Sequence, residues 1–201
     1  MANINHSTLT DPYLHEPKGA GAAANGQVYI ADGAGSGAWI YPPGGWGYYK
    51  DGASAQTFNT TQAKISIDGA GGTTDENYLP REIRGSASLW DTTNDKITPI
   101  RAGDSYDIRL DLPITAKSGS PTELTIELDI AGSTYGSATV ILNRFLATGK
   151  TPPYSYSVAF PIFCLTTFAT NGGQFWLSTD TGTLDITAPA IYIGQNTNGA
   201  I

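Results

Sequence analysis

Apolar and polar residues alternate along much of the chain after about residue 55, a pattern typical of half-buried β-strands. The segment 105–114 is the clearest case, because a strand there would carry charged or hydroxyl side chains at positions 105, 107, 109 and 111. The segment 122–130 repeats this pattern. The residues predicted to face inward are Tyr106, Ile108, Leu110, Leu112 and Ile114 in the first segment, and Leu124, Ile126, Leu128 and Ile130 in the second.

Further short strands are predicted along the rest of the chain, and no window of a dozen residues carries a helical stripe. The turn between the two clearest strands is rich in Gly, Ser and Pro, as turns between antiparallel strands are. Eight or so such strands predict an all-β antiparallel sandwich or jelly roll over residues 51–201. The additional strands are expected at 63–68, 83–90, 137–142, 154–162, 174–178 and 183–193.

Residues 1–50 have a different composition. Ten of the 24 glycines lie in residues 1–52, and only Gln27–Ile30 has the pattern of a strand. A segment of this kind buries too little apolar area to offset its own ordering entropy. We therefore expect an extended, Gly-rich N-terminal arm that lies against a partner.

Charge is distributed unevenly along the chain. The formal net charge is -7 and the pI is about 4.6, which argues against direct binding to nucleic acid. All 11 Lys and Arg residues lie at or before Lys150, and Asp180 and Asp185 are the only charged residues after it. Depletion of charge is typical of the centre of an interface, so this region is predicted to pack against copies of itself. The proposed interface residues are Tyr154, Tyr156, Phe160, Phe163, Trp176 and Tyr192.

Two short segments resemble catalytic or ligand-binding motifs, but neither has the required residues at the required spacing. His15-Glu16 would need a second histidine at position 19, which is Gly, and Pro17 would break the ligand helix. Gly149-Lys150-Thr151 would need a glycine at 144, which is Arg. The pairs Asp107 with Asp111 and Glu123 with Glu127 are interpreted as surface charges, and Cys164 as a buried apolar residue. The predictions are therefore no catalytic residues, no metal, no cofactor and no enzymatic activity.

Two further predictions concern location and ligands. A membrane-spanning helix needs about 20 consecutive apolar residues, and no apolar stretch of the sequence is nearly that long. Residues 1–6 lack the basic and apolar regions of a secretory signal. The aromatic cluster of residues 39–49 could stack on sugars or wedge chains together, and the second use is favoured. The cluster comprises Trp39, Tyr41, Trp46, Tyr48 and Tyr49.

Two stretches of the N-terminal region, 11–19 and 28–39, resemble the arm of head-decoration and head-fibre proteins of tailed bacteriophages. The alternating strands, the segment 167–173 and the closing Ile191–Ile193 are similar to the trimeric jelly roll of those proteins, which looks like the tumour-necrosis-factor fold. The resemblance implies a homotrimeric structural protein that binds the major capsid protein of the phage head. It would be made in the bacterial cytoplasm and lie on the outer capsid surface of the virion.

In this interpretation residues 1–50 anchor the chain to the capsid, and no catalytic set is implied. The expected anchoring residues are Tyr13, Leu14, Val28, Tyr29 and Trp39. Two alternatives stay open: a tail-fibre or spike tip that binds a host-surface glycan, and an enzyme that degrades polysaccharide.

Overall fold

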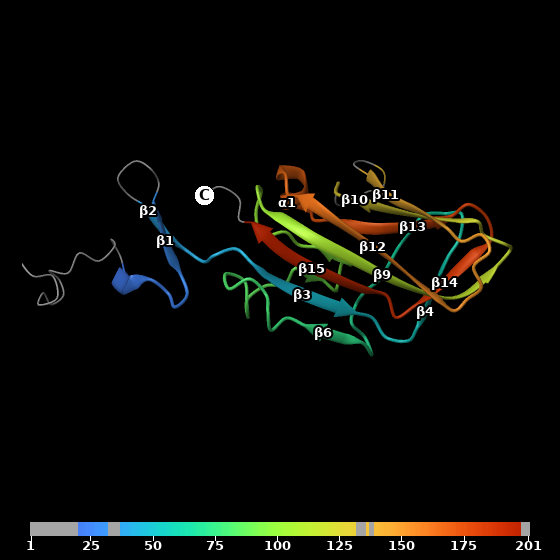
Figure 1. Cartoon of the computed structure of the whole chain (residues 1–201), viewed down its shortest axis with the longest axis horizontal. Helices are drawn as coiled ribbons and strands as arrows, with labels where there is room; N and C mark the ends of the chain where they lie inside the picture. Colours follow the sequence, from blue (N-terminus) through green and yellow to red (C-terminus); the bar gives the residue numbers. More distant parts are fainter. Residues whose placement is uncertain (1–19, 32–36, 132–135, 137–138, 198–201) are drawn as a thin grey trace, which may run out of the picture. The chain divides into compact units, whose positions relative to one another are not determined.

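The computed structural model describes residues 20–31, 37–131, 136 and 139–197. The chain divides into two compact units, Met1–Pro42 and Pro43–Ile201. The second unit contains almost all of the described secondary structure, and Figure 1 shows it as two layers of strands.

The larger layer of the second unit is a seven-stranded antiparallel sheet built around its longest strand, β9. One edge of β9 pairs with β12, and the other edge pairs with β15 and, further along, with β14. The sheet continues from β15 through β3 to β6, and from β14 to β4. Its strands are β3 (Gly45–Lys50), β4 (Ala55–Phe58), β6 (Thr73–Asp75), β9 (Ser105–Ser118), β12 (Tyr154–Phe163), β14 (Thr183–Thr187) and β15 (Ala190–Thr197).

The smaller layer is a four-stranded antiparallel sheet in the order β11-β10-β13-β5. One short helix, α1 (Thr166–Asn171), lies between β12 and β13 in the sequence, and β7 and β8 form a separate two-stranded sheet. The bounds of these strands are β5 (Ala63–Lys64), β7 (Trp90–Asp91), β8 (Lys96–Ile97), β10 (Glu123–Asp129), β11 (Thr139–Leu146) and β13 (Gln174–Thr179).

The strand order defines the fold as a jelly roll. Four strands of one layer run in the order β3-β15-β9-β12, and the facing layer in the order β5-β13-β10-β11, so that neighbours come from distant parts of the chain. Two antiparallel sheets connected in this way are the double Greek key of a jelly roll. The predicted all-β antiparallel jelly-roll sandwich is therefore confirmed.

The core lies between the two layers and follows the predicted alternation in β9 and in the first half of β10. In the second half of β10, Glu127 and Asp129 are buried as well, so the interpretation of Glu127 as a surface charge is wrong. The five inward residues of β9 and the three of β10 each have at most 1% of their surface exposed. Phe160 of β12 meets Phe175 of β13 with ring centroids 6.2 Å apart, which joins the layers. Each fully buried Leu, Ile or Phe side chain stabilises the fold by about 1.5–3 kcal/mol relative to exposure. The buried core residues of the two strands are Tyr106, Ile108, Leu110, Leu112, Ile114, Leu124, Ile126 and Leu128.

Two predicted strands differ from the structure for backbone reasons. The segment 183–193 is divided into β14 and β15, because Ala188 has a positive φ of 52° and Pro189 follows it. The segment 83–90 is mostly turn: the amides of Ile83 and Arg84 both donate to the carbonyl of Pro80, and a strand begins only at Trp90.

The first unit contains one short 3₁₀ helix, η2 (Ala20–Ala22), and an antiparallel pair formed by β1 (Val28–Ala31) and β2 (Gly37–Ile40). The sequence predicted β1 but not β2. The compact sandwich unit also begins earlier than the predicted boundary at residue 50, because β3 pairs with β15 along its whole length.

Candidate interaction surfaces

The outward-facing side of the larger sheet carries the most conspicuous group of functional candidates. Residues opposite each other in the ladder share a face, so the register places Tyr48, Tyr192, Arg109 and Ala159 in one row across four strands. The next row contains Trp46, Gly194, Asp107 and Pro161. These eight residues define what we call the outer sheet face.

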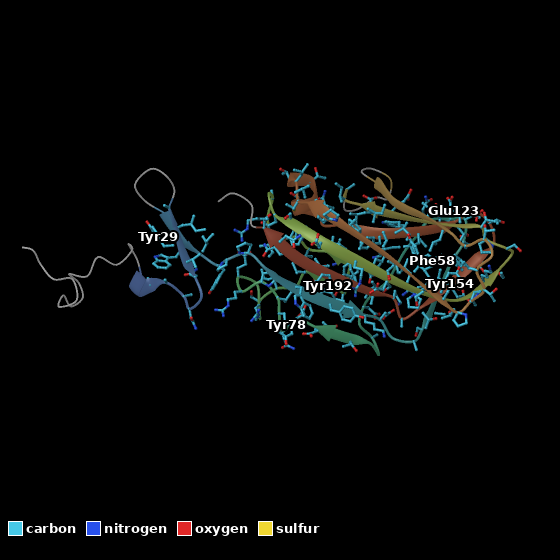
Figure 2. All side chains as sticks on the ribbon, in the orientation of Figure 1. Tyr29, Phe58, Tyr78, Glu123, Tyr154 and Tyr192 are labelled. Atoms are coloured by element: carbon cyan, nitrogen blue, oxygen red, sulfur yellow. The ribbon has the colours of Figure 1, made fainter. Side chains whose placement is uncertain are left out.

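Aromatic rings run across one half of the outer sheet face. Trp46 stacks on Tyr78 with ring centroids 4.8 Å apart and lies 5.8 Å from Tyr192. The guanidinium carbon of Arg109 lies 5.9 Å from the ring centroid of Tyr192, in the range of a cation–π contact. In Figure 2, Tyr78 and Tyr192 lie on the side of the sandwich formed by β3, β6 and β15. These contacts fix the rings in place without burying them.

The other half of the outer sheet face is hollow. A depression of about 370 Å³ is lined by Asp107, Arg109, Ala159, Pro161 and Tyr192, among others. The depression forms because β12 presents only the small side chain of Ala159 and the compact ring of Pro161 there. The neighbouring position on β15 is Gly194, which the Tyr192 side chain overhangs.

Most of the charge at this surface is compensated within the chain. Arg109 Nε lies 3.1 Å from Asp111 Oδ2, and Ser157 Oγ donates to Asp111 Oδ1 at 2.6 Å. Because an ion pair with its own hydrogen bonds is less costly to desolvate than a lone charge, a partner could cover this region.

Exposed apolar side chains gather at the end of β12. Phe163 is 75% exposed and Leu165 72% exposed. Among the described strands, β12 pairs only with β9, so its other edge is open. An open edge with large apolar side chains is a surface that natural proteins normally cover.

The residues predicted for the trimer interface occupy three different places. Tyr154, Tyr156 and Phe160 face inward from β12 and pack against the core. Phe163 and Tyr192 face outward, and Trp176 lies on the outward side of β13, which belongs to the other layer. The charge-poor strands therefore do not form one continuous face.

The predicted aromatic cluster of residues 39–49 is also divided. Trp39 and Tyr41 belong to the N-terminal unit, Trp46 and Tyr48 to the outer sheet face, and Tyr49 is buried in the core. The sequence did not single out Arg109, Tyr78, Leu165 or the small residues around the hollow. Strand register places Arg109 and the small residues, and loop packing places Tyr78 and Leu165. No local sequence pattern encodes either arrangement.

The predicted anchoring residues fall partly within the described part of the chain. Val28, Tyr29 and Trp39 lie on β1 and β2, whereas Tyr13 and Leu14 lie outside the described residues. Tyr29 and Trp39 pack edge to face with ring centroids 5.4 Å apart, and Val28 is 43% exposed.

A buried polar network closes one end of the sandwich. Asp104 is fully buried, accepts hydrogen bonds from Tyr106 Oη at 2.8 Å and Gln195 Nε2 at 2.9 Å, and lies 3.8 Å from Arg101 Nε. Cys164 is also buried, as predicted, and burial raises the pKa of its thiol to about 11, with the Asp104 carboxylate adding to the shift. A neutral, enclosed thiol is a poor nucleophile, so this network acts on stability.

The described residues contain no group of three or more His, Cys, Asp or Glu side chains that could hold a metal ion. His6 and His15 lie outside that part of the chain. No helix in the described ranges is long and apolar enough to cross a membrane.

Together these features define a jelly-roll protein with a separate N-terminal strand pair and an outer sheet face of aromatic, small and charged residues. No family model matches the sequence, and no curated protein matches it. Among solved structures, the fold is similar to Eiger TNF from S. frugiperda, at 9% identity and a TM-score of 0.48, over 79% of this chain and 96% of that one. It is also similar to the PRD1 vertex protein P5, at 13% identity and a TM-score of 0.45, over 77% of this chain and 97% of that one.

Proposed function

We propose that this chain is a structural protein of the outer surface of a tailed-phage head. Its N-terminal unit attaches it to the major capsid protein, and its sandwich self-associates as a homotrimer. In this role it needs neither a cofactor nor a catalytic residue.

The main support for self-association comes from the outer sheet face and the neighbouring end of β12. A large exposed apolar surface on a protein usually marks a contact with another protein. Here Phe163 and Leu165 project beside a hollow lined by Ala159 and Pro161. If the projecting residues of one copy meet the outer sheet face of the next, the contact is heterologous, and a threefold rotation between copies closes it into a trimeric ring.

Support for attachment comes from the N-terminal unit. The stretch 28–39, which resembles the arm of phage head proteins, contains β1 and part of β2. This unit is compact by itself, and the sandwich from Pro43 onward has its own core. A chain divided in this way can use one part for binding and the other for self-association.

Native mass spectrometry of the purified protein tests the trimer. We expect three times the 21.1 kDa chain mass at micromolar concentration. Phe163→Asp together with Leu165→Asp should reduce the mass to that of one chain, whereas Thr125→Asp on the other layer should not. A monomeric wild-type protein would contradict this part of the proposal.

Cryo-electron microscopy of the virion tests the location. Density repeated over the whole head would support a capsid-surface role, and the N-terminal unit should contact the shell in that density. A handful of copies at the tail would contradict it.

A second candidate function is binding of a host-surface glycan at a tail tip. It is favoured by one observation: Tyr78 is 55% exposed and stacks on Trp46, which lies 5.8 Å from Tyr192, the ring that Arg109 contacts. An aromatic ring beside hydrogen-bonding groups can hold a sugar ring. Binding of the purified protein to host polysaccharide that is lost in Tyr78→Ala, combined with a low copy number, would favour this function.

A further inference from the structure

The β1–β2 sheet is too small to account for its own stability. It has two strands of four residues each, and isolated two-stranded sheets are marginally stable in water at best. Residues 20–31 and 37–42 also contain no Asp, Glu, Lys or Arg. A strand pair without charge and without a core of its own is expected to be completed by a partner.

The two faces of this sheet differ. On one face, Tyr29 lies opposite Trp39, and their rings pack edge to face at 5.4 Å. Gly37 makes room for this packing: a Cβ atom there would lie only 2.8 Å from Tyr29 Cζ. The aromatic face is therefore occupied by contacts within the sheet.

The other face is apolar and open. Val28 lies opposite Ile40, and Ile30 lies opposite Ala38, so these four side chains share a side. Val28 is 43% exposed and Ile30 48% exposed. This face carries the apolar surface that the sheet leaves uncovered within its unit.

We infer that the Val28–Ile30 face is the docking surface that attaches the chain to the shell protein, while the Tyr29–Trp39 pair holds the sheet in shape. The inference rests on the proposed function and deepens it. The expected partner surface is uncharged and apolar, beside an exposed strand edge that β1 or β2 extends through backbone hydrogen bonds. This divides the predicted anchoring residues into a contact residue, Val28, and two shape-holding residues.

Area favours a repeating shell surface over a second copy of this sheet as the occupant. A stable pairwise interface buries about 1,200–2,000 Å², which is far more than four short side chains can supply. A contact this small becomes effective when several copies bind one lattice, because effective concentration then multiplies a weak affinity.

Because residues 20–31 and 37–42 carry no charged side chain, attachment through them should depend little on salt concentration. Raising NaCl from about 0.1 M to about 1 M shortens the Debye length from about 10 Å to about 3 Å and weakens attachment through ion pairs. Attachment through the Val28–Ile30 face should change less than about twofold over the same range.

The experiment uses the full-length protein and phage heads assembled from a genome that lacks this reading frame. Bound protein is measured by co-sedimentation as a function of concentration. Val28→Thr combined with Ile30→Thr keeps both side chains β-branched but replaces a methyl group of Val28 and the ethyl group of Ile30 by hydroxyl. We expect this double variant to bind about tenfold more weakly or worse. Tyr29→Phe, which keeps the ring pair, is the matched control and should bind like wild type.

Each other outcome overturns the inference in a recognisable way. Wild-type-like binding by the double variant, or loss of wild-type binding at high salt, means that another surface makes the attachment. Conversion of the trimer to a monomer by the double variant, seen in its native mass, means that a second copy covers this face. If the wild-type protein does not bind the heads at all, the proposed function fails and the inference with it.

Discussion

The sandwich and the β1–β2 sheet are both built from short antiparallel strands, but they hold their strands together differently. In the sandwich, two layers face each other and bury a continuous set of side chains, including Tyr49, Trp90 and Phe175, at no more than 1% exposure. In the β1–β2 sheet, the main packing contact is one aromatic pair, and the opposite face stays exposed. The sandwich is stable by itself because a second layer covers each sheet. The β1–β2 sheet has no second layer among the described residues of its unit and therefore needs a partner.

Cutting the chain between the two regions should have the largest effect. A chain that begins at Pro43 should fold and melt like full-length protein, because it keeps all of β3. A chain that begins at Tyr49 should lose at least about 2 kcal/mol of stability, because it gives up several backbone hydrogen bonds that contribute about 1 kcal/mol each. It lacks Trp46, whose amide donates to the Tyr78 carbonyl at 2.7 Å, and it uncovers the edge of β15. Thermal melts of both truncated chains measure the difference, and equal melting temperatures would contradict the assignment of β3 to the sandwich.

The next prediction sharpens the contrast between the inside and outside of the sandwich. Phe160→Asp places a charge against Phe175 in the core and should cost about 3–5 kcal/mol. Thr125→Asp lies on the outward side of β10, where Thr125 Oγ1 donates to Glu123 Oε1 at 3.2 Å, and should cost less than about 1 kcal/mol. Urea unfolding of the two variants compares them directly. If Thr125→Asp were the more destabilising, the inward and outward positions would be exchanged.

The sequence predicted the core of this fold well because alternation is local. Burial of every second residue in β9 as far as Ile114, and in β10 as far as Ile126, follows from a period of two, which one strand displays by itself. β3 was missed because Gly45 and Gly47 weaken its pattern: Gly47 provides the space in which the Tyr49 ring lies. β2 was missed because Gly37–Ile40 has only four residues, which is too short for a clear alternation of apolar and polar positions. Its strand conformation depends on pairing with β1.

The interaction surfaces were less predictable because they depend on neighbours distant in sequence. Depletion of charge after Lys150 drew attention to β12 and β15, but it did not show that Phe160 faces inward and Phe163 outward relative to the other strands. Only the strand register shows that Tyr192 shares the outer sheet face with Arg109 and Tyr48. Trp176 shares the same low-charge region but lies on the other layer.

A pair of tyrosines offers a smaller test of the comparison. Tyr49 Oη donates to Glu76 Oε1 at 2.9 Å and accepts from the buried amide of Leu89 at 3.2 Å. Tyr49→Phe leaves that amide without this acceptor and should cost about 1–3 kcal/mol. Tyr29→Phe, in the β1–β2 sheet, should leave the melting temperature of the isolated protein unchanged. Equal shifts in calorimetry would mean that both regions unfold as one cooperative unit.

The smallest expected effect concerns pH and belongs to the sandwich alone. Burial raises the pKa of Asp51, and the neighbouring Asp68 raises it further. A carboxyl group whose pKa is higher in the folded state stabilises the fold at pH values below its unfolded pKa of about 3.9, and this contribution is lost as pH rises through the folded pKa. Asp51→Asn should therefore raise the melting temperature at pH 7 and have less effect near pH 4, since the Asn side chain can still accept from Gln56 Nε2, which lies 3.2 Å from Asp51 Oδ2.

Asp180 serves as the control, because its pKa is lowered in the folded state and not raised. The Thr122 hydroxyl and the amides of Glu123 and Thr122 hold its pKa at about 2. Its contribution is present above the unfolded pKa and is lost as pH falls toward 2, so Asp180→Asn should lower the melting temperature at pH 7. Both effects should be identical in full-length protein and in the chain that begins at Pro43, because both carboxyl groups lie in the sandwich. A pH response that disappears with residues 1–42 would show that the N-terminal unit contributes to the stability of the sandwich, contrary to the contrast between the two regions.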